Sequence, residues 1–169
     1  KADAIVITGA ESTAKVYAVI NKINEVAGTG YDHVVYGFVD GVEATNLYAK
    51  ISSTATSGAI NGVKIFEVKK NSSDVVTTLN PITVTASGVT LTGSSTVSGN
   101  ILKYNDNGTE RALTLATDVI VYVWSTDDKA WTVGSTIDLE GLTDGDKLEW
   151  AALDTSNGHD PNVADVVFV

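Results

Sequence analysis

Residues Tyr31–Ile51, with the sequence YDHVVYGFVDGVEATNLYAKI, decide the fold class of this chain. Runs rich in Val, Tyr and Phe stand on both sides of the dipeptide Asp40-Gly41. An Asp-Gly pair suits the two left-handed positions of a tight hairpin turn, and β-branched and aromatic side chains pack well on a pleated strand. The stretch therefore predicts two antiparallel strands, Tyr31–Val39 and Val42–Ile51.

Similar short runs separated by turn residues continue along the rest of the chain. Lys15–Val26 alternates in polarity, and its many β-branched residues favour a strand over the competing helix. Glu110–Leu115 and Val119–Ser125 are two further predicted strands. Turn signals spaced about 8–12 residues apart are typical of sandwiches and barrels. We therefore expect an all-β, antiparallel protein with a sandwich-like or barrel-like fold and no convincing helix.

A domain boundary is predicted at Asn80-Pro81, because proline starts or edges strands rather than lying within them. The chain is then divided into two small packed β subdomains, residues 10–79 and 80–169. Residues 1–9 stand apart as a terminal strand.

The two ends of the chain resemble each other. Ala2-Asp3 is followed by the apolar residues Ala4, Ile5, Val6 and Ile7, and Ala164-Asp165 is followed by Val166–Val169. The repeat predicts a module of a tandem array, although chance similarity between short apolar segments is an alternative. Residues 1–9 would be the last strand of a preceding module, or an assembly strand that adds to a neighbour's sheet. The absence of Met fits a processed chain or a piece of a longer protein.

Charge and composition exclude several classes of partner and site. The net charge is −10 with only 11 basic residues, so there is no cluster to neutralise nucleic-acid phosphates or an anionic membrane. Apolar runs are too short for membrane insertion, and the absence of Cys excludes disulfides and thiolate metal sites.

Three segments carry a resemblance to a known family. LTLATDVIVYVWSTDD (Leu113–Asp128), GSTIDLEGLTDGDKLEWAALDT (Gly134–Thr155) and VADVVFV (Val163–Val169) resemble the C-terminal half of repeated β modules in bacterial S-layer proteins. Lys15–Lys50 is similar to their N-terminal half. The resemblance implies a structural, non-catalytic module of an extracellular surface layer or filament. Its partners would be copies of itself or neighbouring modules, with cell-wall polymer bound only through domains outside this sequence.

The last loop is the candidate metal site. In S-layer modules this loop often resembles Asp-x-Asp-x-Asp-Gly, whereas here Ser156 takes the second acidic place. Calcium prefers several oxygen ligands on a loop, and Asp154, Asn157, Asp160 and Asp165 would supply them. The alternative is a solvated turn in which these side chains bond their own backbone. Calcium is thus the one candidate cofactor, and none is certain. The acidic run Asp138–Asp146 is interpreted as a pair of turns.

Three tryptophans, Trp124, Trp131 and Trp150, allow a second interpretation. If they are buried, they only fill the hydrophobic core. If they are exposed in a coplanar row, they would stack on sugar rings, and the chain would be a carbohydrate-binding or adhesion module of a cell-surface protein. Catalysis is not expected, because the Gly-x-Ser-x-Gly pattern is absent and His33 and His159 stand in unrelated contexts. We predict no catalytic residues.

Overall fold

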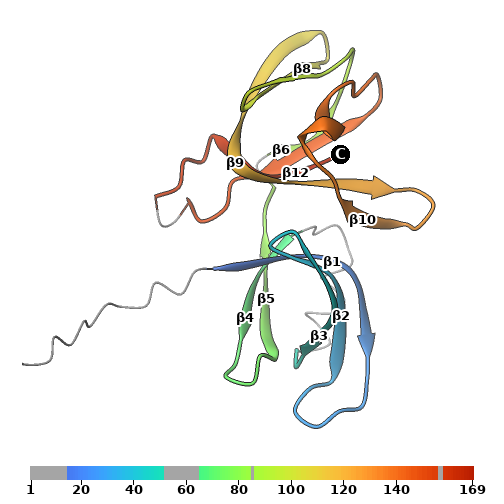
Figure 1. The fold of residues 1–169 in the computed structure, drawn as a ribbon, viewed down its shortest axis with the longest axis vertical. Coiled ribbons are helices and arrows are strands. Elements are labelled where there is room, and N and C mark those ends of the chain that lie inside the picture. The colour runs from blue at the N-terminus through green and yellow to red at the C-terminus, as the bar shows by residue number, and fades with distance from the viewer. Residues whose placement is uncertain (1–14, 52–64, 85, 156–157) are drawn as a thin grey trace, which may run out of the picture.

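The computed structural model places two β units one above the other along the long axis of the molecule (Figure 1). It describes residues 15–51, 65–84, 86–155 and 158–169. These residues form strands and one short 3₁₀ helix, so the predicted all-β, barrel-like class is confirmed.

The first unit is a five-stranded barrel with the order β1-β2-β3-β5-β4, in which β4 pairs back with β1. Its strands are β1 (Val16–Glu25), β2 (His33–Val39), β3 (Val42–Ala49), β4 (Ile65–Lys70) and β5 (Val76–Ile82). The predicted strand over Lys15–Val26 and the Asp40-Gly41 hairpin are both present. Asp40 and Gly41 have φ angles of 46° and 78°, as a tight hairpin turn between right-twisted strands requires.

The second unit is a curled sheet with the order β6-β11-β12-β9-β8-β7, and β10 also pairs with β9. Leu91, directly after β6, bridges Asp106 at the end of β8, so the sheet curls almost into a second barrel. Its elements are β6 (Ala86–Thr90), β7 (Thr96–Ser98), β8 (Ile101–Asp106), β9 (Thr109–Ser125), β10 (Ala130–Val133), the 3₁₀ helix η1 (Thr136–Leu139), β11 (Lys147–Ala151) and β12 (Val163–Phe168).

The connection between the units and the long strand β9 both differ from expectation. Pro81 lies within β5, opposite Phe66, so the boundary follows Ile82 instead of lying at Asn80-Pro81. Proline is tolerated there because the other side of β5 at this point has no strand partner in the described residues.

The two strands predicted at Glu110–Leu115 and Val119–Ser125 are one 17-residue strand, β9. It runs parallel to β12, whereas an antiparallel fold was expected throughout. Parallel strands need a crossover connection, and β10, η1 and β11 supply it here.

A third apolar cluster joins the units. Its buried members are Val19 and Ile65 of the barrel with Tyr122, Val166 and Phe168 of the sheet. Full burial of such a side chain contributes about 1.5–3 kcal/mol to folding. The Phe38 and Tyr122 ring centroids lie 5.6 Å apart across the junction, within the range of favourable aromatic pairs. Burial of Tyr122 in the junction raises the pKa of its hydroxyl to about 12, against a smaller opposing effect of its hydrogen bond with the Gly41 backbone.

A β-bulge in β1 aims one polar side chain across the junction. Ile20 pairs with Gly37 and Lys22 with Tyr36, so Asn21 has no partner in the ladder. Gly37 makes this close approach feasible, because a Cβ at its position would lie 2.0 Å from the carbonyl oxygen of Val19.

The Asn21 carboxamide binds the edge of β10 that faces away from β9. Its Nδ2 donates to the carbonyl oxygen of Trp131 at 2.9 Å, and its Oδ1 accepts from the Trp131 backbone N–H at 2.8 Å. The amide thus pairs with this edge in the way that a neighbouring strand would. The barrel and the sheet are fastened at β1 and β10, which lie side by side (Figure 1).

Replacement of Asn21 by Ala is expected to lower the free energy of unfolding by about 1–3 kcal/mol, because it removes two hydrogen bonds to the backbone of the half-buried Trp131. Urea unfolding measures the change. Asn24→Ala, in the regular part of β1 opposite Val34, is the matched control and should cost much less. Equal losses in the two variants would contradict the role of Asn21.

Candidate functional site

Two hollows lie on either side of the aromatic junction. Ile120, Tyr122 and Trp124 alternate along β9 and therefore point to the same face of the sheet. Tyr122 is buried under the barrel, while Ile120 lines a cavity of about 690 Å³ and Trp124 lines a cleft of about 550 Å³. The residues at the junction thus define two candidate sites.

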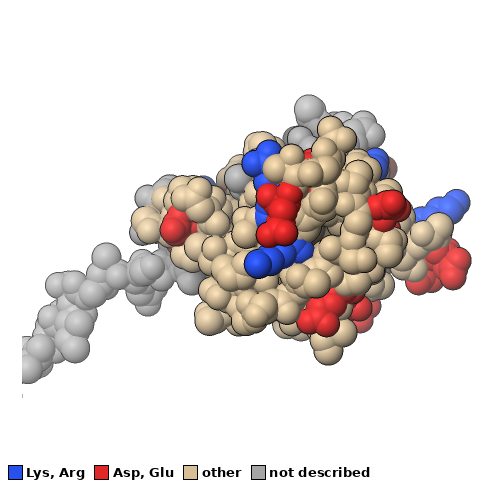
Figure 2. All heavy atoms as spheres, turned by 90° about the horizontal axis from the view of Figure 1, so that it is seen from above, with Lys and Arg blue, Asp and Glu red and all other residues tan. Residues whose placement is uncertain are grey.

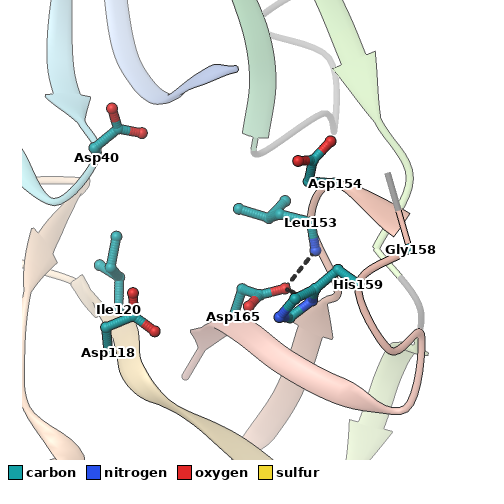
Figure 3. Close-up of a pocket in the computed structure, with 8 residues that line it drawn as sticks. All are labelled: Asp40, Asp118, Ile120, Leu153, Asp154, Gly158, His159 and Asp165. Carbon is teal, nitrogen blue, oxygen red and sulfur yellow. Dashed lines mark hydrogen bonds and ion pairs between the residues drawn. The ribbon is translucent and has the colours of Figure 1, made fainter. Parts of the chain in front are cut away.

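The first hollow, here the acidic cavity, collects side chains from both units (Figure 3). Asp40 comes from the β2–β3 turn, Asp118 and Ile120 from β9, and Asp165 from β12. The loop between β11 and β12 closes it with Leu153, Asp154, Gly158 and His159.

Asp165 is the most constrained carboxylate of the acidic cavity. It lies opposite an irregularity in β9, since Ala164 pairs with Leu115 and Val166 with Ile120. Its Oδ2 accepts the Leu153 backbone N–H at 2.6 Å and lies 3.2 Å from Nδ1 of His159. Burial raises the pKa of Asp165, and the N–H of Leu153 and the charge of His159 oppose that rise.

The other residues predicted as calcium ligands have separate partners. Asp154 forms a 3.0 Å ion pair with Lys15, and its backbone N–H donates to the Tyr17 hydroxyl at 3.1 Å. Asp160 accepts both the backbone and the side-chain N–H of Asn162, so it behaves as the solvated turn that was the alternative. Asn157 lies outside the described residues.

The structure brings only part of the predicted calcium set together. Asp154 and Asp165 line the same cavity, and Asp160 is not among its lining residues. Across the described ranges, no three His, Asp or Glu side chains are grouped so that they would hold a metal ion.

The second hollow, here the tryptophan cleft, contains two of the three predicted tryptophans. Trp124 is 45% exposed and Trp131 is half-buried, with ring centroids 5.2 Å apart and planes at 67°. Trp150 is half-buried against the core of the second unit. The coplanar row expected of a sugar-binding module is therefore not formed, and one tryptophan is core bulk.

Charged side chains surround the two tryptophans. The cleft is lined by Asp138, Asp146, Lys147 and Glu149, together with Phe168. Asp138 accepts the Ser135 N–H and Asp146 the Thr143 N–H, each at 2.7 Å. A pair of turns was predicted here, but Asp138 lies in the 3₁₀ helix η1, and the segment around Asp146 is a turn. Both segments line the cleft beside the tryptophans, which depends on long-range packing that no local sequence pattern shows.

The remaining predicted residues lie elsewhere. Ala4, Ile5, Val6 and Ile7 fall outside the described residues. The two histidines are in different units, and His33 is buried in the barrel with its Nδ1 2.6 Å from Oδ1 of Asp32.

Comparison of the chain with protein-family models, curated proteins and solved structures found no match. Within the described ranges, no helix has both the length and the apolar character needed to cross a bilayer. The resemblance to S-layer modules therefore stays a prediction from the sequence.

Asp165→Asn is expected to raise the melting temperature at neutral pH. The pKa of Asp165 is higher in the folded chain than its ordinary value of 3.8, so the folded state favours the protonated carboxyl. This preference stabilises the fold fully at pH values below 3.8. It is lost as the pH rises through the pKa of the folded state. Asn removes the buried charge and keeps an acceptor for the Leu153 N–H. The difference in melting temperature between the variant and the parent should shrink as the pH falls to values at which the carboxyl of Asp165 is protonated in the parent.

Thermal unfolding at a series of pH values measures this effect. Asp127→Asn is the control, since it removes an exposed carboxylate of the β9–β10 turn and leaves the surroundings of Asp165 unchanged, whereas Asp118 itself helps to raise the pKa of Asp165. An Asp165→Asn variant that is less stable than the parent at every pH would show that the carboxylate charge is required.

Proposed function

We propose that the chain is a structural, non-catalytic module of a bacterial cell-surface assembly, an S-layer or an extracellular filament, in which copies associate through sheet edges. The observation that carries the proposal is the junction, which fastens two β units into one body. A module that sets a spacing in a lattice or filament needs such stiffness.

The junction is held at three separate points. Tyr122 and Phe168 pack against the barrel in its centre, Asn21 binds β10 on one side, and Lys15 pairs with Asp154 on the other. Three contacts spread across an interface oppose rotation about any one of them. Exposed ion pairs contribute little, about 0–1 kcal/mol, so the apolar centre and Asn21 carry most of the resistance.

An open strand edge supports association between copies. The barrel closes between β3 and β5 through one residue pair, Ala49 and Val76. The rest of the outer edge of β3 has no strand partner in the described part of the chain. Val42, at the start of this edge, is 70% exposed. An edge of this kind is a template for pairing with another chain.

The surface and the sequence agree with this role. Most of the side chains on the face seen in Figure 2 are uncharged, and its Lys and Arg side chains lie in small groups beside Asp and Glu. The acidic net charge favours solubility of the free module. The resemblance of Leu113–Asp128 to S-layer modules is the reason to prefer an extracellular, bacterial setting.

Val42→Lys tests the edge. A lysine on an open edge strand opposes pairing, so assembly followed by light scattering and electron microscopy should require at least about tenfold more protein. Ile137→Lys is the matched control, because Ile137 is an equally exposed apolar residue, at 74%, outside the β3 edge. Equal effects of the two variants, or a parent chain that stays monomeric at all concentrations, would contradict the proposal.

Deletion of residues 1–9 tests the predicted assembly strand separately. The truncated chain should keep its circular-dichroism spectrum and lose assembly, since Ala4–Ile7 would be the segment that adds to a neighbouring sheet. Normal assembly of the truncated chain would show that residues 1–9 are not the assembly strand, and the β3 edge would then be the remaining candidate for pairing between copies.

A further inference from the structure

The tryptophan cleft is the exposed end of a chain of aromatic contacts. From the junction outward, the rings of Tyr122 and Phe168, Phe168 and Trp131, and Trp131 and Trp124 have centroids 5.5, 5.2 and 5.2 Å apart. Each ring is fixed by the one before it, and the Trp124 backbone N–H also donates to Val169 at 2.8 Å. The indole of Trp124 is therefore held in place before any ligand arrives, which reduces the entropy cost of binding.

The core does not require Trp124. The residue is 45% exposed, whereas the core of the sheet is formed by buried residues such as Leu102, Leu115 and Leu148. The ring instead forms a wall of a cleft of about 550 Å³, within the range of about 300–1,000 Å³ typical of small-ligand sites.

The rim of the cleft supplies hydrogen-bonding groups around this aromatic wall. Asp138 and Asp146 are oriented by backbone N–H groups of their own turns, and each carboxylate keeps acceptor capacity beyond those bonds. Lys147 adds a donor and Glu149 another acceptor. Fixed acceptors and a donor around an apolar ring match a sugar, whose ring faces carry C–H groups and whose edge carries hydroxyls.

The charges of the rim select among sugars. Three carboxylates and one lysine line the cleft, so an acidic sugar or a phosphate would be repelled. A ligand cation would gain from the indoles and carboxylates, so it is the competing ligand that the test below must exclude. A neutral ligand avoids repulsion by the carboxylates and can use both the acceptors and the Lys147 donor.

We propose that the tryptophan cleft binds a neutral carbohydrate of one or two sugar rings, stacked on Trp124 and hydrogen-bonded by Asp138, Asp146 and Lys147. This site is independent of the structural role, since the β3 edge lies on the other unit. The proposed site uses Trp124 and Trp131, whose rings are in edge-on contact, in place of the coplanar row of three tryptophans expected from the sequence.

Titration of the whole chain with cellobiose, maltose and chitobiose, followed by tryptophan fluorescence and calorimetry, tests the proposal. At least one disaccharide should bind and change the fluorescence. Trp124→Ala should weaken that binding at least tenfold, and Lys147→Ala, at an exposed position, should weaken it several-fold. Trp150→Phe, which changes a tryptophan outside the cleft lining, should leave the affinity unchanged.

Three results would overturn the proposal. One is the absence of binding to all three sugars up to their solubility limits. The second is binding that Trp124→Ala leaves unchanged in a variant whose circular dichroism is that of the parent. The third is binding of choline, used as a cationic probe, at the same cleft with higher affinity than any of the sugars.

Discussion

The contact between the Asn21 carboxamide and the Trp131 backbone is the constraint on which the arrangement of this molecule depends. It exists only because β1 has a bulge at Asn21 and because Gly37 lets the neighbouring strand approach closely. It fixes β10 against the barrel, and with β10 it fixes the indole of Trp131. A side chain that takes the place of a strand thus holds β10 against the barrel, together with the apolar cluster at the centre of the junction.

The hairpin that decides the fold class also contributes to the junction. Its turn is tied to β1, since Asp40 and Tyr17 exchange backbone and side-chain hydrogen bonds of 2.9 and 3.0 Å. Gly41 in the same turn lies beside Ile120, whose side chain would stand 3.3 Å from an added Cβ. The turn therefore fills the space between the buried junction and the acidic cavity. One local motif serves the barrel and the interface together.

Local patterns predicted the features that depend on neighbouring residues. The Asp40-Gly41 hairpin and the β1 strand followed from turn chemistry and β-branched content, and the structure confirms both. The contact between Asn21 and Trp131 and the continuity of β9 depend on partners more than 40 residues away, so no local pattern shows them. Alternation along β9 puts Tyr122 and Trp124 on one face of the sheet. It does not show that the barrel covers Tyr122 and leaves Trp124 exposed.

The candidate sites show the same limit. Acidic residues in the last loop predict a calcium site, but in the fold each carboxylate has a protein partner. Asp154 pairs with Lys15, Asp160 accepts from Asn162, and Asp165 accepts from the Leu153 N–H.

The proposed structural role requires the two units to form one stiff body, and amide ¹⁵N relaxation tests this requirement most directly. It predicts one overall rotational correlation time for the amides of the barrel and of the sheet. Two distinct and shorter correlation times, one for each unit, would contradict it.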